Sequence, residues 1–307
     1  MNKYAKRYLI DAMSGMAQGL FCSLLIGTII KTLGQQLYNL NQNIVFSFLV
    51  KVGEFAGESH VVGAAMAVGI GFAMQVPALV LFSLVAVGAA ANVTGGAGGP
   101  LAVLVIAIVS AELGNLVSKK TKVDIIVTPA VTILSGVLLT VLTAKYIGIA
   151  ASSVGKFLVW ATKLHPFWMG ILVSAVVGIA LTLPISSAAI CAAFGLTGLA
   201  GGAAVAGCCA QMVGFAVMSF KENRWGGVLS QGLGTSMLQM PNIIKKYVSR
   251  FLLASQKRIN PIAHRQQVTS AKESLVTPHI SKAIIGIHVT LEVYIRCSQG
   301  FDLSSLE

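Results

Sequence analysis

Long parts of the chain consist of apolar residues and contain no charged side chain. Residues 12–30, 61–111 and 125–144 carry none, and between 164 and 220 the one side chain expected to carry charge is His165. The hydrocarbon core of a bilayer is about 30 Å thick, and about 20 apolar helical residues cross it. The pattern therefore predicts membrane-spanning helices near residues 14–32, 61–76, 78–92, 101–117, 125–143, 167–183, 186–200 and 203–219.

These segments define the expected fold class. It is an all-α polytopic membrane helix bundle with about eight transmembrane helices, some of them broken at proline or glycine, and a polar C-terminal tail. Of the 307 residues, 55% are hydrophobic and 10% are charged. An ordinary soluble domain carries about 25% charged residues, so the composition excludes an ordinary soluble enzyme. The short central helices are expected to be broken or tilted.

The basic residues predict the orientation in the membrane. The net charge of +12 suits either a nucleic-acid partner or the cytoplasmic face of a membrane protein, and the apolar segments favour the second. Under the predicted count, the basic clusters at 3–7, 119–122 and 221–224 fall on one side, which places the N-terminus in the cytoplasm. Lysines at 145, 156 and 163 fall on the opposite side. That segment is therefore either an interfacial or re-entrant element, or a place where the count is wrong.

The composition changes after Pro241, because only Gly286 and Gly300 of the 32 glycines lie beyond it. Residues 1–241 form the predicted transmembrane domain. Residues 242–255 place apolar side chains on one helical face and basic ones on the other, which is typical of a helix lying on an anionic membrane surface; a soluble packing helix is the alternative. Residues 256–307 form a divergent polar tail.

Glycine and proline mark three interruptions in the apolar segments. The stretch ANVTGGAGGP (91–100) is either a tight turn between two helices or an unwound segment that lines a cavity. Pro129 and Pro184 lie in two similar apolar segments, 125–133 and 179–190, and are predicted to break their helices. Helices broken at matching places indicate a transporter's substrate site. Simple kinks that shape the bundle explain them equally well.

Several polar side chains within the apolar segments are candidate binding residues. Glu112 is an isolated carboxylate near a helix end; such groups are functional candidates, although Glu112 and Asp124 also lie close enough to the basic loop to neutralise it. Glu58 and His60 suit proton or sugar-hydroxyl chemistry, or simply mark a hydrated edge. Many hydrogen-bonding groups with few charges suit a small neutral sugar or polyol. The candidate substrate-binding residues are Glu112, Asn92, Thr128, Ser186, Ser187 and Gln211.

No motif for a catalytic residue, a metal ion or a cofactor is found. The five cysteines lack zinc spacing and cannot form a disulfide framework. No phosphate-binding lysine motif, dinucleotide fingerprint or hydrolase motif occurs.

Two long phrases, KVDIIVTPAVTI (122–133) and FKENRWGGVLSQGLGTSMLQ (220–239), carry a resemblance to a known family. Residues 8–260 resemble the second EIIC-type membrane family of the bacterial phosphotransferase system. The resemblance implies a permease fold for sugar uptake coupled to phosphorylation, with soluble phosphotransferase components as partners, because this chain shows no phosphate-donor domain. Further apolar spans would be expected after Asn260, so a truncated or frame-shifted C-terminus is a hypothesis.

The leading functional hypothesis is therefore an EIIC-like permease subunit of the cell membrane. Its expected partners are the lipid bilayer, a neutral sugar or polyol, soluble phosphotransferase components and, as an open alternative, further copies of itself. A membrane-embedded sensor that regulates gene expression without transport is the runner-up. An ion channel or exchanger is less favoured, because few ionisable groups lie within the spans.

Overall fold

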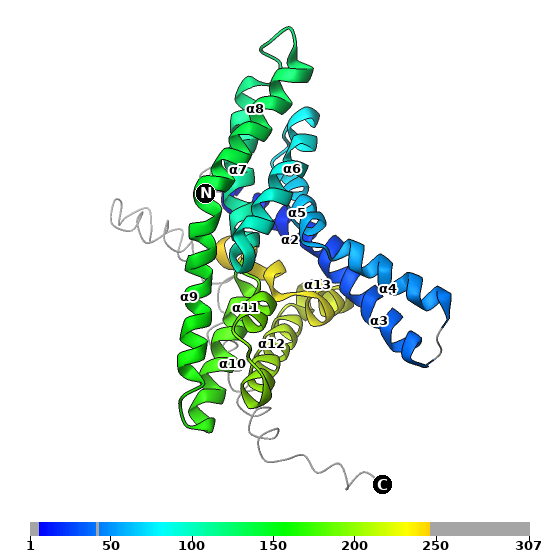
Figure 1. The fold of residues 1–307 in the computed structure, drawn as a ribbon, viewed down its shortest axis with the longest axis vertical. Coiled ribbons are helices and arrows are strands. Elements are labelled where there is room, and N and C mark those ends of the chain that lie inside the picture. The colour runs from blue at the N-terminus through cyan, green and yellow to red at the C-terminus, as the bar shows by residue number, and fades with distance from the viewer. Residues whose placement is uncertain (1–5, 41–42, 246–307) are drawn as a thin grey trace, which may run out of the picture.

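The computed structural model describes residues 6–40 and 43–245, and within these ranges the protein is built from helices without strands (Figure 1). Of the predicted interfacial helix at 242–255, residues 242–245 are described and are helical. The remainder of that segment and the tail at 256–307 lie outside the described residues. Four stretches are long and apolar enough to cross a membrane, and a bent pair of helices makes a fifth. The described part of the protein is thus helical, with several candidate membrane spans.

The described residues between 6 and 73 form one long helical hairpin. Its first arm contains η1 (Lys6–Asp11), α2 (Ala12–Leu20), η2 (Phe21–Leu25) and α3 (Ile26–Leu40). Its second arm contains α4 (Ile44–Ala56) and α5 (Ser59–Ala73), which meet at a 55° bend. The bend divides the hairpin, so that α2 and α5 pack in the body of the molecule while α3 and α4 project from it (Figure 1).

Glycines allow the two arms of this hairpin to touch through their backbones. A Cβ atom built on Gly15 would lie 2.1 Å from the carbonyl oxygen of Gly69, and one on Gly19 would lie 2.2 Å from that of Ala65. The same antiparallel register continues outward, where a Cβ atom on Gly34 would lie 2.9 Å from the backbone nitrogen of Val50. Small residues are the usual means of close helix packing within a membrane, where helices gain little from hydrophobic burial against each other.

The second hairpin contains α6 (Ala78–Gly95) and α7 (Gly99–Val117), joined by the 3₁₀ turn η3 (Gly96–Gly98). Gly96 has φ +50°, a value that favours glycine, and it reverses the chain. The helices are antiparallel, because Gly95 lies beside Ala102 and Gly114 beside Val80. The continuous helical stretch Ala78–Val117 is therefore two crossing-length helices, each about 27 Å long at 1.5 Å per residue. Of the two interpretations of the glycine-rich stretch, the structure has the tight turn.

The next element is a straight helix that runs along the whole side of the molecule (Figure 1). It contains α8 (Asp124–Leu139), the π-helical segment η4 (Thr140–Ala144) and α9 (Lys145–Ala161), 38 residues in all. The sequence predicts a span that ends near residue 143 and leaves the segment after it open, as an interfacial or re-entrant element or a wrong count; the structure continues the same helix through it. The reason is an amphipathic pattern in α9: Ala151, Gly155, Leu158 and Ala161 are buried on one face, while the lysines at 145 and 156 are exposed.

The predicted break at Pro129 is wrong, because α8 continues through this residue. Pro129 lies in the second turn of the helix. It removes only the hydrogen bond that its own missing N–H would have donated to the carbonyl of Ile125, and the remaining turns are intact.

The prediction of a span at 186–200 is also wrong. The structure has only the seven-residue helix α11 (Ser187–Ala193), flanked by α10 (Pro166–Thr182) and α12 (Gly198–Met218). Seven residues span about 10 Å, too short for a bilayer. Gly195 and Gly198 both have φ +58°, and these left-handed positions end the helix before it could lengthen. Pro184 lies in the interruption between α10 and α11.

Two buried cores divide the described part of the chain into two bundles. The first core is formed mainly by α2, α5, α6 and α7, and the second by α9, α10, α11 and α12. The chain then turns back through α13 (Phe220–Val228), η5 (Leu229–Gly234) and η6 (Ser236–Gln239) to the level where the bundles meet. Met237 belongs to the first core, while its neighbour Ser236 bonds to Thr182 at the end of α10. This last segment therefore joins the two bundles.

Candidate functional site

Interruptions of three helices meet where the two bundles join. They are the turn at 96–98, the segment 183–186 and the extended residue Thr235, with φ −150° and ψ +141°. The Ser186 N–H donates to the carbonyl of Ala97 at 3.0 Å. The Thr182 and Ser236 hydroxyls lie 3.1 Å apart. Non-helical backbone at membrane depth requires such partners or water, so this junction is the natural place to look for a binding site.

A chain of uncharged polar side chains, two of them buried and one half-buried, lies at this junction. The Gln211 amide Nε2, on α12, donates to Thr182 Oγ1 at 3.0 Å, and Thr182 Oγ1 contacts Ser236 Oγ. Thr182 is 6% exposed and Ser236 is fully buried. Each of the three residues comes from a different segment, so the chain of hydrogen bonds depends on the arrangement of α10, α12 and η6 together.

Two further buried polar atoms near α12 lack a hydrogen-bond partner among the described residues. Gln231, on η5, is 3% exposed and its Oε1 accepts no hydrogen bond. Ser174, two turns before Thr182 on α10, is 2% exposed and its Oγ is likewise unpaired. An unsatisfied buried polar group costs about 1–3 kcal/mol. Because native proteins rarely leave such groups unpaired, these atoms are suited to a water molecule or a polar ligand.

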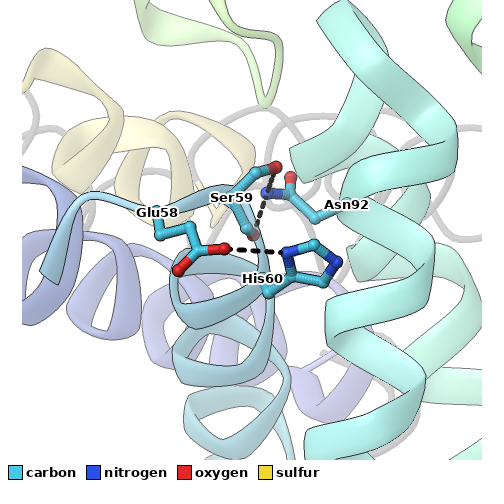
Figure 2. Close-up of polar contacts among 4 residues, drawn as sticks. All are labelled: Glu58, Ser59, His60 and Asn92. Carbon is cyan, nitrogen blue, oxygen red and sulfur yellow. Dashed lines mark hydrogen bonds and ion pairs between the residues drawn. The ribbon is translucent and has the colours of Figure 1, made fainter. Parts of the chain in front are cut away.

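On the first bundle, Asn92 connects α6 to the start of α5 (Figure 2). Its Nδ2 donates to the backbone oxygen of Ser59 at 2.8 Å and to Ser59 Oγ at 3.1 Å. Asn92 is 8% exposed, and its Oδ1 faces Gly99, where a Cβ atom would approach it to 2.4 Å. Asn92 therefore ties the α4–α5 bend to the glycine turn.

Beside Asn92, His60 and Glu58 form an exposed hydrogen-bonded pair (Figure 2). His60 Nδ1 lies 3.2 Å from Glu58 Oε1, and both side chains are more than half exposed, at 62% and 54%. The pair is accessible from outside the bundle and presents hydrogen-bonding groups near the bend.

Four of the six candidate binding residues lie at the junction. Besides Asn92 and Gln211, these are Ser186, whose Oγ accepts from the Ala189 N–H at 3.2 Å, and Ser187, which is 8% exposed. Ser186 caps α11 through this bond to the Ala189 N–H. Its own backbone N–H bonds to Ala97.

Glu112 and Thr128 lie at the far end of the first bundle. Glu112 is about 20 Å along α7 from Gly99, at 1.5 Å per residue, and its Oε1 lies 3.0 Å from Arg7 Nη2. Thr128 is fully buried and its hydroxyl donates to Asp124 Oδ1 at 2.5 Å. These two side chains neutralise or cap local groups and do not face the junction.

The sequence analysis did not select Thr182, Ser236 or Gln231. Thr182 stands two residues before Pro184, so a hydroxyl beside a helix interruption was the available signal. Ser236 and Gln231 lie in the phrase SQGLGTS, where pairs of polar residues flank two glycines. No group of three histidine, cysteine, aspartate or glutamate side chains in residues 6–40 and 43–245 could bind a metal ion.

The protein has long apolar helices, and uncharged polar groups lie where the interruptions of these helices meet. These features define a multi-pass membrane protein. The chain also belongs to a known family of such proteins. The family model described as "Phosphotransferase system, EIIC" matches residues 10–250. The protein is therefore a member of the EIIC family, which confirms the resemblance found in its sequence. No curated protein and no solved structure matched the chain.

Proposed function

We propose that this protein is the sugar-binding membrane subunit of a phosphotransferase system, and that a small neutral sugar or polyol binds where the two bundles meet. The observation that carries the proposal is the uncharged chain formed by half-buried Gln211 and buried Thr182 and Ser236. Amides and hydroxyls both donate and accept hydrogen bonds, so they can bind sugar hydroxyls without requiring a charged ligand.

In this proposal the junction residues exchange partners when the sugar binds. The Gln211 amide and the Thr182 hydroxyl, bonded to each other at 3.0 Å, would each turn to a sugar hydroxyl. The unpaired Gln231 Oε1 would accept a further hydrogen bond. The bond between Gln211 and Thr182 is thus replaced by bonds to the sugar, so neither of these two side chains would be left without a partner.

Asn92 and the Glu58–His60 pair would form the side of the site that belongs to the first bundle. Phosphoryl transfer is assigned to separate soluble components of the system, since the family supplies the membrane subunit. This chain would bind the sugar, exclude water from it and present it to them.

The orientation with the N-terminus in the cytoplasm is part of the proposal. Its support is the Arg7–Glu112 ion pair, which brings the N-terminal basic residues to the end of α7, beside the basic loop at 119–122. Basic residues at one end of the bundle favour the cytoplasmic side. Labelling of single cysteines at Lys6 and Lys120 with a membrane-impermeant thiol reagent in intact cells tests this orientation. Labelling before lysis would contradict it.

Sugar uptake and sugar binding test the function directly. Cells with and without the gene are compared for uptake of a panel of labelled sugars, and the purified full chain in lipid nanodiscs is titrated with the same panel. Uptake together with binding supports the permease. Binding with changed transcription and unchanged uptake would support the sensor instead, and absence of binding across the panel would contradict both.

A further inference from the structure

A pocket of about 300 Å³ lies directly after α12 and plays no part in the proposed sugar site. It is lined by Phe220, Lys221, Arg224 and Trp225. All four side chains are exposed. The pocket therefore combines two cations with two aromatic rings on a surface that the neighbouring helices leave open.

The cations of this pocket are available for an anion. Neither Lys221 nor Arg224 forms an ion pair with any residue in the described ranges. Glu222, the acidic residue between them, is not among the lining residues. Arginine presents a planar set of donors that matches phosphate oxygens, and lysine adds a mobile point charge.

The aromatic residues give the pocket an apolar wall. Phe220 is 44% exposed and Trp225 is 71% exposed. Their rings meet edge to face, with 5.8 Å between centroids. Tryptophan is enriched at membrane–water interfaces, because its ring is apolar while its N–H remains hydrated.

The backbone of Arg224 forms the pocket. With φ +47° and ψ −140°, Arg224 interrupts α13 in a conformation that favours glycine. The turn brings Arg224 and Trp225 to the same pocket as Phe220 and Lys221. Strained backbone of this kind is concentrated at ligand sites.

The pocket also lies at the end of a candidate membrane span, since α12 ends at Met218. We propose that it binds the phosphate of an anionic lipid headgroup, with Lys221 and Arg224 contacting the phosphate and Phe220 and Trp225 contacting the glycerol and upper acyl chain. A soluble anion such as inorganic phosphate would offer the same phosphate group to these two cations. The exposed rings beside the end of a span favour the lipid as its source.

Thermal unfolding of the full chain in detergent tests the proposal, with phosphatidylglycerol, phosphatidylcholine or inorganic phosphate added at equal concentration. We expect phosphatidylglycerol to raise Tm by several degrees, through binding to the folded state alone, and the other two additions to raise it much less. Arg224→Gly should abolish most of that increase. Because glycine adopts φ +47° without strain, the variant without lipid should unfold at the original Tm or above it.

Two further variants complete the test. Lys221→Gln should reduce the lipid-dependent increase at least by half, and it keeps the backbone of Arg224 unchanged. Lys120→Gln removes an exposed cation from another loop and should keep the increase. An equal loss in Lys120→Gln would indicate general attraction of anionic lipid and overturn the site. An increase retained in Arg224→Gly, or an equal increase with inorganic phosphate, would also overturn the proposal.

Discussion

Ser186 donates its backbone N–H to the carbonyl oxygen of Ala97 at 3.0 Å, and this bond joins interruptions in two different bundles. Ala97 belongs to the turn between α6 and α7, whereas Ser186 follows α10. Each group would otherwise lack a helical partner. The two bundles are thus connected at the level where the buried polar side chains lie, and a ligand bound there would contact both.

Gln211→Leu is expected to lower the affinity for the proposed sugar at least about fivefold. The substitution removes the donor to Thr182 Oγ1 and keeps a similar side-chain volume. Loss of a buried hydrogen bond to a ligand costs about 1–3 kcal/mol. Titration of the purified protein with sugar measures the change.

A matched control for that variant is Ser83→Ala. Ser83 is 6% exposed, and its hydroxyl donates to the Leu79 carbonyl within α6, in the first bundle. Its removal should leave the sugar affinity unchanged. An equal loss of affinity in both variants would show that Gln211 acts only through stability.

Glu112→Gln is expected to leave sugar affinity within about twofold of the original. Glu112 pairs with Arg7 at 3.0 Å, at the far end of α7 from the junction. The pair is about 30% exposed, so its loss should cost at most about 1 kcal/mol of stability after solvent screening. Sugar titration and thermal unfolding are measured together. A tenfold loss of affinity would indicate that Glu112 takes part in sugar binding and would contradict this prediction.

Gly15→Val is expected to prevent normal packing of α2 on α5. A Cβ atom at this position meets the Gly69 carbonyl oxygen at 2.1 Å, and backbone cannot move away as a flexible side chain can. Overpacking costs about 1–3 kcal/mol, and a backbone clash costs more. The yield of monodisperse protein and its Tm in detergent should both fall.

Gly214→Val is the corresponding control, because a Cβ atom there has nothing within 4 Å. Normal yield is expected for this variant. If Gly15→Val proved as stable as Gly214→Val, the close contact between α2 and α5 would be contradicted.

Asn92→Asp is expected to destabilise the protein by about 1–3 kcal/mol. The substitution removes both hydrogen bonds that Asn92 donates to Ser59, and it places a carboxylate oxygen beside the backbone oxygen and Oγ of Ser59. The new carboxylate should also make stability depend on pH, falling as the group ionises. Tm measured between pH 4 and 8 reveals both effects. Asn115→Asp, at an exposed position on α7, should change Tm little. A flat pH profile in Asn92→Asp would contradict the buried contact.

The sequence predicted the helices well where charge is absent, because the backbone of a lipid-exposed segment must satisfy its own polar groups. It failed at 186–200, where composition is apolar but Gly195 and Gly198 have φ +58°. A glycine in the sequence permits a left-handed conformation, but the sequence alone does not show whether the glycine adopts it. The predicted end of a span near residue 143 failed for the opposite reason, since exposed lysines on one face are compatible with a continuous helix.

The candidate site could be predicted only in part, because contacts between distant residues decide it. Thr182 and Ser236 are 54 positions apart, and nothing local indicates that they meet. Glu112 attracted attention as an isolated carboxylate, yet Arg7 lies beside it in space. Polar residue type and helix interruptions selected Asn92, Ser186, Ser187 and Gln211, and the fold decided which hydrogen bonds they form.

The 38-residue helix Asp124–Ala161 is the one described helix shared along its length by both bundles. Its central segment, Thr140–Ala144, is π-helical, and such widened turns are common where helices deform at functional sites. Any movement of one bundle against the other would therefore have to be accommodated by this shared helix, whose regular α-helical hydrogen bonding is interrupted at Thr140–Ala144. If the junction opens and closes, bending of this one helix would let each bundle move as a rigid body.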